Sequence, residues 1–271
     1  MTGRIYLLQE DGALQPLDER PYANEGLLQG LLADYPDLLA GDQIDEALPR
    51  RWLLVAREAG VPLRQEGSDQ MSLDHLFLDQ DAVPTLVEVK RSSDTRIRRE
   101  VVGQMLDYAS NAVAYWSEAT LRARFEARCE SEGLDPMQVA AEFLEEDAEA
   151  GDEVDVEAFW AQVKTNLQAG RIRLLFVADE IPPELRRIVE FLNRFMDPVQ
   201  VLAVEVPQYV GQGLKTLVPR LIGQTVETQA KSSGHNSSRT WRRLSYRGIA
   251  RATVAGPSRK WMNCAPSKYV S

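Results

Sequence analysis

The sequence predicts an α/β protein with a mixed central sheet, and two stretches of the chain carry that prediction. Residues 71–78 and 85–91 are rich in Val, Leu and Phe and are separated by Asp and Pro residues, a pattern typical of a β-hairpin. Two apolar stretches at 171–178 and 199–206 flank a helix that opens at Pro182, and such a β–α–β run favours parallel strands. We place both parts in one sheet, which would then contain antiparallel and parallel pairs.

Helices are predicted before, after and between these strands. The first runs from Glu25 to about Leu32, with leucines on its inner face and Asn24 before it. Another follows the hairpin and continues through Tyr108 to about Ala114, with an apolar stripe along one side. A helical insertion is expected at about 116–169, with helices at 118–132, 137–144 and 156–168.

The N-terminal region gives weaker signals. Residues 4–8 read as a short strand, and residues 12–20 read as a polar connector. The apolar run within 51–59 fits either a short helix or a strand. The first strand of the sheet is expected at 63–66, and a last strand at about 214–218.

The charge distribution separates the chain into two parts. After Glu227 there is no acidic residue but there are nine basic ones, which leaves 41 acidic and 22 basic side chains before that point. We therefore expect one domain at 1–224 and a basic, disordered tail at 225–271. Two interpretations of this basic composition stay open. The tail either contributes electrostatically to nucleic-acid binding, or it is an out-of-frame or degraded C-terminus. The acidic body argues against a broad nucleic-acid surface, so any such contact must be local.

Composition excludes several classes of protein. Two cysteines make no disulfide framework, and two histidines argue against a zinc site, so His75 is interpreted as a packed core residue. No apolar run approaches the ~20 residues of a membrane helix, and acidic residues at Glu10 and Asp11 interrupt any signal-like segment. We expect a cytoplasmic protein without a membrane partner.

Polar residues occur in the hairpin where apolar ones would be expected. Side chains alternate along a strand, so Glu88 and Lys90 share a face. If the turn is centred on Asp81, Asp74 lies opposite Glu88, with Cβ atoms roughly 4.5–5.5 Å apart. Two carboxylates at that distance repel unless a proton or a cation lies between them, and hard divalent cations accept such ligands. This pattern predicts a cation site beside Lys90.

The helix after the hairpin and the loop before it add further polar groups. Gln104 and Tyr108 are four residues apart and therefore lie one above the other on the helix. The preceding loop carries four guanidinium groups, whose planar donors suit phosphate oxygens. These candidate nucleic-acid-binding residues are Arg91, Arg96, Arg98 and Arg99.

These residues together resemble a known family. Asp74, then thirteen residues, then Glu88-Val89-Lys90, followed by Gln104-x-x-x-Tyr108 on a helix, is similar to the PD-(D/E)XK nuclease superfamily. The Q-x-x-x-Y helix resembles that of RecB-type nuclease domains, which are related to the tRNA-splicing endonuclease-like group. The motifs cover roughly residues 20–110. The residue before Asp74 is Leu73 and not Pro, at a position that varies widely in the superfamily.

The resemblance implies a restriction-endonuclease-like αβββαβ core and a defined set of metal ligands. Asp74, Glu88 and the Val89 carbonyl would bind Mg²⁺ or Mn²⁺, and Glu25 matches the acidic residue that members often add from the first helix. Lys90 would position water or stabilise the charge on the phosphate. The superfamily's Gln and Tyr, here Gln104 and Tyr108, would orient the lysine, the water or the backbone.

Each residue also has a plainer explanation. Glu88 and Lys90 could be a solvent-facing strand pair, and Glu25 a first-turn acid favoured by the helix dipole. Gln104 and Tyr108 could be ordinary helix residues, and the loop arginines a solvated run.

Three hypotheses about function follow from the sequence. The first is a metal-dependent nuclease, with DNA favoured over RNA. The second is a catalytically inactive nucleic-acid-binding or protein-interaction module on the same fold. The third is that the likeness to the nuclease fold is a coincidence, and that the chain is a cytoplasmic α/β interaction protein with a charged strand. Because many superfamily members dimerise, the resemblance leaves open whether this chain forms a homodimer.

Overall fold

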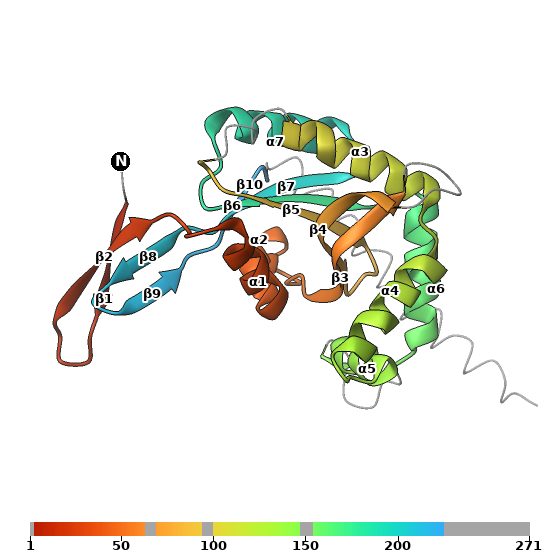
Figure 1. Ribbon diagram of the computed structural model, residues 1–271, viewed down its shortest axis with the longest axis horizontal. Coiled ribbons are helices and arrows are strands. Elements are labelled where there is room, and N and C mark those ends of the chain that lie inside the picture. Colours follow the sequence, from red (N-terminus) through yellow and green to blue (C-terminus); the bar gives the residue numbers. More distant parts are fainter. Residues whose placement is uncertain (1–2, 63–68, 94–99, 147–153, 225–271) are drawn as a thin grey trace, which may run out of the picture. The chain divides into compact units, whose positions relative to one another are not determined.

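The structure is a computed structural model that describes residues 3–62, 69–93, 100–146 and 154–224 (Figure 1). The chain divides into two units, Met1–Gln229 and Ala230–Ser271, and every described residue belongs to the first. The predicted basic tail at 225–271 lies outside the described residues, as does the strand predicted at 63–66.

A six-stranded sheet forms the centre of the described unit. Its strands, in spatial order, are β10 (Arg220–Ile222), β7 (Gln200–Glu205), β6 (Arg173–Ala178), β5 (Pro84–Lys90), β4 (Asp69–Asp79) and β3 (Trp52–Pro62). The pairs β3–β4, β4–β5 and β7–β10 are antiparallel, whereas β5–β6 and β6–β7 are parallel. The predicted mixed sheet is confirmed, and the hairpin and the β–α–β run do belong to it.

Helices cover both faces of this sheet, which explains why its central strands are apolar on both sides. On one face, α3 (Glu100–Tyr115) and α7 (Pro183–Phe195) pack through Met105, Tyr108 and Leu185 (Figure 1). On the other face, α1 (Glu25–Asp34), the 3₁₀ turn η1 (Pro36–Leu39) and α2 (Gly41–Ile44) bury Leu28, Leu39 and Ile44, respectively. None of the described helices has the length and apolar character needed to cross a membrane.

The helical insertion occurs where it was predicted. Its helices are α4 (Glu118–Ser131), α5 (Pro136–Glu145) and α6 (Val156–Gln168). Side-chain oxygens of Ser117, Asp135 and Asp155 accept N–H bonds at the three N-termini, which explains why the helices start there. Phe125 and Trp160 pack together in the cluster that continues beneath α3.

The protein has a second, four-stranded sheet, most of which was not predicted from the sequence. It has the order β1 (Arg4–Leu8), β2 (Leu14–Arg20), β8 (Gln208–Gly211) and β9 (Leu214–Leu217). The prediction of a polar connector at 12–20 is wrong, because Leu14–Arg20 pairs with β1 and with β8. The alternation was present, with Gln15 and Leu17 buried, but a glutamine at a buried position concealed it.

The ambiguous segment at 51–59 is strand β3. Trp52, Leu53 and Val55 are buried, which a strand covered on both faces requires. The register against β4 shifts between Leu54 and Ala56, so this strand carries an irregularity of the β-bulge kind.

Candidate functional site

The β4–β5 hairpin has the predicted register. His75 pairs with Val87 and Leu76 with Leu86, which is the pairing expected for a turn centred on Asp81. The ladder ends at His75, so Asp74 lies just beyond the last pair instead of within one. Its carboxylate reaches across to the next strand, where Oδ2 accepts the Val89 N–H at 2.7 Å.

The backbone near Asp74 departs from simple alternation. On β3, Arg57 pairs with His75 and Ala59 with Leu73, which leaves Glu58 opposite Asp74 without a pair. Glu58 has a φ of 48°, a left-handed conformation that is uncommon for residues other than glycine. Asp74 lies at the end of the hairpin that also carries Glu88 and Lys90.

Lys90 lies at the centre of the candidate site. Its Nζ is 3.0 Å from Glu88 Oε1, 3.3 Å from Glu25 Oε1 and 3.9 Å from Asp74 Oδ2. The same ammonium donates to the Val89 carbonyl at 2.9 Å. Three carboxylates from α1, β4 and β5 thus converge on one cation, so the predicted grouping of Glu25, Asp74, Glu88 and Lys90 is present in the structure.

Glu88 is the most deeply buried acid of the group. Only 2% of its side chain is exposed, and its Oε2 has no hydrogen-bond partner among the described residues. Burial, with the neighbouring Asp74 carboxylate, raises the pKa of Glu88 to about 7, although Lys90 opposes the shift. A solvent-facing strand pair, the plainer explanation of Glu88 and Lys90, is therefore wrong.

The pKa values of Asp74 and Lys90 are also shifted. Burial raises the pKa of Asp74, against the opposing effects of the Val89 N–H bond and Lys90. Burial lowers the pKa of Lys90, but the Glu88 and Asp74 carboxylates outweigh it and the net pKa is raised. Lys90 therefore carries its positive charge throughout the physiological range of pH. A buried cluster of this kind is a candidate functional site on physical grounds.

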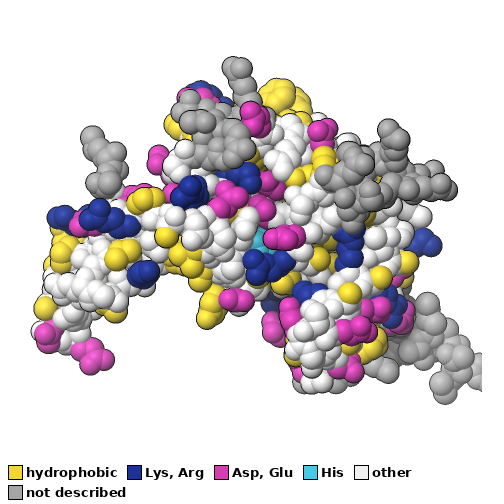
Figure 2. Space-filling model, in the orientation of Figure 1, with side chains coloured by type: hydrophobic (Ala, Val, Ile, Leu, Met, Phe, Trp, Pro, Cys, Tyr) yellow, Lys and Arg dark blue, Asp and Glu magenta, His cyan; other side chains and the backbone are white. Residues whose placement is uncertain are grey.

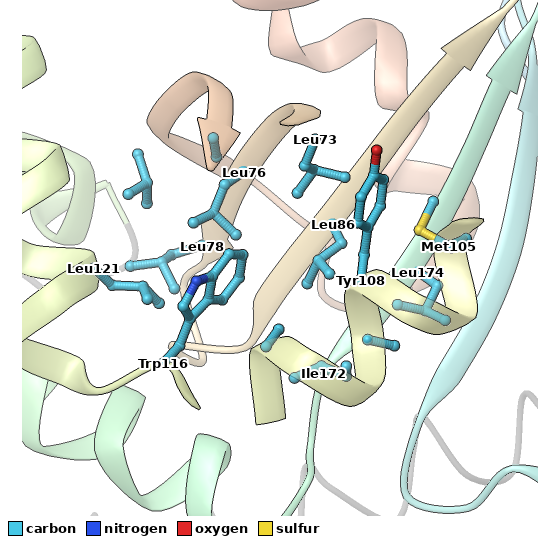
Figure 3. Close-up of a cluster of buried hydrophobic side chains, with 14 of the residues drawn as sticks. Leu73, Leu76, Leu78, Leu86, Met105, Tyr108, Trp116, Leu121, Ile172 and Leu174 are labelled. Carbon is cyan, nitrogen blue, oxygen red and sulfur yellow. The ribbon is translucent and has the colours of Figure 1, made fainter. Parts of the chain in front are cut away.

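Tyr108 contacts the backbone of β4, and Gln104 contacts Tyr108. The Tyr108 hydroxyl donates to the Ser72 carbonyl at 2.7 Å, two residues before Asp74, and Gln104 Nε2 donates to the same hydroxyl. Figure 3 shows the Tyr108 ring on α3 beside Leu73 and Leu86, with its hydroxyl beyond the apolar cluster. Of the predicted roles, contact with the backbone is the one for which the structure gives a hydrogen bond.

The predicted arginines are only partly described. Arg91 follows β5 directly and donates to the Ala23 carbonyl at 3.3 Å, at the residue before the N-cap of α1. Arg96, Arg98 and Arg99 lie outside the described residues. On the face drawn in Figure 2, acidic and basic side chains lie side by side over the central part of the molecule.

The donors at the site fit a hard divalent cation. Among the described residues, no group of three or more His, Cys, Asp or Glu side chains is arranged as a ready metal site. Mg²⁺ requires less, because it is usually bound by one or two carboxylates and retains several waters. The oxygens that would form such a set are Glu88 Oε2, which lacks a partner in the described part of the chain, the Asp74 carboxylate, and the Val89 carbonyl, which accepts from Lys90.

One residue of the site, Gln29, was not predicted from the sequence. Gln29 on α1 donates from Nε2 to Asp74 Oδ1 at 2.8 Å, and its carbonyl lies 2.9 Å from His75 Nε2. The signal was available, because Gln29 is four residues after Glu25 and therefore on the same side of the predicted helix. His75 is a buried residue as predicted, and it also has this polar contact.

Comparisons with models of known protein families, with curated proteins and with solved structures found no significant match. The chain is therefore assigned to no family by similarity.

Proposed function

We propose that this protein is a metal-dependent nuclease that hydrolyses phosphodiester bonds, with DNA as the favoured substrate. One observation carries the proposal: acidic side chains from α1, β4 and β5 converge on Lys90 beside the Val89 carbonyl. A buried carboxylate pair with an adjacent ammonium is the grouping that phosphoryl-transfer sites use, with a metal ion as the counter-charge.

The order of the elements adds support for the resemblance to PD-(D/E)XK nucleases. Apart from the short η1 and α2 after α1 and the inserted helices α4, α5 and α6 after α3, the chain runs α1, β3, β4, β5, α3, β6, which matches the αβββαβ order that the resemblance implies. In this order Asp74 lies on β4, the second of the three strands, and Glu88 and Lys90 lie on β5, the third.

The proposed mechanism assigns a role to each side chain. Asp74 Oδ2, Glu88 Oε2 and the Val89 carbonyl would hold Mg²⁺ or Mn²⁺, together with the carboxylate of Glu25, which lies 3.3 Å from Lys90 Nζ. When bound, the ion supplies Lewis-acid polarisation of the scissile phosphate and lowers the pKa of a coordinated water. Lys90 stabilises the negative charge that develops on the phosphate oxygens. Tyr108 holds the β4 backbone at Ser72 and thereby fixes the strand that carries Asp74.

The proposal is tested by incubating the full chain with single-stranded, duplex and branched DNA and RNA. The expected result is cleavage of at least one substrate with Mn²⁺ or Mg²⁺ and none with EDTA. No metal-dependent cleavage of any substrate would contradict the proposal.

A specific observation also favours the second hypothesis, a binding module without catalytic activity. The ammonium of Lys90 lies within 4 Å of all three carboxylates and offsets part of their charge without a metal. Titration with Mn²⁺ separates the two hypotheses, because a binding module has no need of an ion near Asp74. Nucleic-acid binding without Mn²⁺ binding would favour the module.

A further inference from the structure

Gln29 fixes one side of the Asp74 carboxylate. Its side-chain amide donates to Oδ1 at 2.8 Å, while Oδ2 accepts the Val89 N–H at 2.7 Å. One donor comes from a helix and the other from the neighbouring strand. With both oxygens bound in this way, rotation of the carboxylate about its Cβ–Cγ bond would break a hydrogen bond.

The backbone carbonyl of Gln29 makes a second hydrogen bond to β4. The Gln29 carbonyl lies 2.9 Å from Nε2 of His75, and because a carbonyl can only accept, Nε2 carries the hydrogen. His75 is fully buried and stacks on Phe77 with ring centroids 5.8 Å apart. Gln29 therefore contacts two consecutive residues of β4, through its side chain and through its backbone.

Packing of α1 does not depend on the Gln29 amide. Leu28 and Leu32 are fully buried and hold the helix against the sheet, and Asn24 caps its first turn. The amide is directed instead at a residue of the candidate site. The helix also presents Glu25 to Lys90 from one turn earlier, so one side of α1 contacts two members of the site.

The chemistry of an amide suits this place. A lysine or arginine there would neutralise Asp74, whereas an amide orients the carboxylate and leaves its negative charge for a cation. Each carboxylate oxygen has about two acceptor sites, so a single hydrogen bond leaves each oxygen able to bind a second partner. Groups that hydrogen-bond a metal ligand in this way tune its geometry and affinity.

We propose that Gln29 is a positioning residue that holds the Asp74 carboxylate in the orientation required for binding a divalent cation. The inference rests on the proposed function, because it assumes that Asp74 binds the ion. It predicts a specific defect: without the amide, the ion binds more weakly, and added metal reduces the loss of activity.

The test compares Gln29→Leu and Gln29→Met with wild type, with Asp74→Ala and with a matched control. The control is Gln138→Leu, which deletes an exposed amide–carboxylate bond of the same length, 2.8 Å, to Glu142 in the insertion. Binding of Mn²⁺ alone is measured by electron paramagnetic resonance without nucleic acid, and cleavage is then measured across a range of Mn²⁺ concentrations. We expect both Gln29 variants to fold and to bind Mn²⁺ about 10- to 100-fold more weakly. Their cleavage should approach the wild-type rate at high Mn²⁺, and Gln138→Leu should match wild type.

The other outcomes separate this inference from the function on which it rests. Wild-type Mn²⁺ affinity in both Gln29 variants, with loss of binding in Asp74→Ala, overturns the positioning role and leaves the nuclease proposal standing. Equal Mn²⁺ binding by wild type and Asp74→Ala, or no binding by either, overturns the metal assignment and the positioning role together. Failure of both Gln29 variants to fold assigns the residue to the stability of the fold and also overturns the positioning role.

Discussion

The ammonium of Lys90 lies 3.0 Å from Oε1 of Glu88, whose side chain is almost fully enclosed. The two residues are two apart on β5 and therefore point to the same face of the strand. A buried carboxylate next to a single cation is sensitive to the loss of that cation, because its charge then has no compensation. The properties of either residue should therefore change when the other is replaced.

Replacement of Lys90 by methionine should abolish most of the proposed activity. The substitution keeps an unbranched side chain but removes the charge that stabilises the reacting phosphate. Loss of one such stabilising group costs about 10²–10³-fold in kcat. Single-turnover cleavage at saturating Mn²⁺ measures the effect, and Lys164→Met on the exposed side of α6 is the matched control. Cleavage by Lys90→Met at more than a third of the wild-type rate would remove Lys90 from the mechanism.

Replacement of Glu88 by glutamine should stabilise the metal-free protein at neutral pH. The pKa of Glu88 is raised from 4.5 to about 7, so the folded state holds this proton more tightly than the unfolded chain does. The free energy of unfolding therefore falls as pH rises from about 4.5 to 7. Above pH 7 the total loss reaches up to about 3 kcal/mol. Glu88→Gln has no such loss. Urea unfolding in EDTA at pH 4.5, 6 and 8 should show a stability difference that grows with pH.

Addition of Mg²⁺ should reverse this order. A ligand that binds only the folded state stabilises it, and the variant lacks one of the proposed ligands. The thermal midpoint of wild type should rise with Mg²⁺, and that of Glu88→Gln should respond less. A stability difference independent of pH in EDTA would contradict the assignment of a buried, protonatable Glu88.

His75 should make the protein sensitive to acid. Burial lowers the pKa of His75 from 6.5 to about 4, because protonation of the enclosed ring is unfavourable. The stability associated with the neutral ring is complete above pH 6.5 and is lost as pH falls towards 4, by about 1.4 kcal/mol per pH unit. His75→Gln cannot titrate, so the difference in unfolding free energy between wild type and variant should narrow or change sign over this window. A constant difference between pH 7 and 4.5 would show that His75 does not titrate as proposed.

Gly41 should tolerate no side chain. A Cβ built at Gly41 would lie 1.8 Å from the Arg50 carbonyl oxygen, which belongs to the backbone and cannot move aside cheaply. Gly41→Ala should therefore destabilise the protein by more than about 3 kcal/mol, in the range of severe steric substitutions. Gly103→Ala is the control, since a Cβ there meets nothing within 4 Å and alanine favours the helix by roughly 0.5–1 kcal/mol. Equal stability of the two variants in urea would contradict the close approach of α2 to Arg50.

Local patterns were sufficient to predict the elements that carry the site. The hairpin register followed from the turn residues and from strand alternation, and α6 was predicted with its observed bounds. These features depend on neighbours in sequence, where periodicity and capping residues act. The convergence of Glu88 and Lys90 follows from that register, which is why it could be anticipated.

Features that depend on distant parts of the chain could not be predicted. Strand β2 pairs with β8, whose residues follow nearly 200 positions later, and nothing local marks such a pairing. Gln29 meets Asp74 across 45 positions and looked like a single polar residue in a leucine-rich helix. The left-handed backbone of Glu58, on the strand beside Asp74, was equally hidden, because the sequence has no glycine there to signal it.

The most direct test of the central claim is cleavage of nucleic acid by Glu88→Gln. The variant should be at least as stable as wild type in EDTA, so loss of activity could not be attributed to unfolding. With Mn²⁺ and the best wild-type substrate, we expect cleavage by Glu88→Gln to fall by at least about 10²-fold, while Glu142→Gln on the exposed side of α5 retains full activity. Cleavage by folded Glu88→Gln at the wild-type rate would contradict a catalytic site at the end of β5.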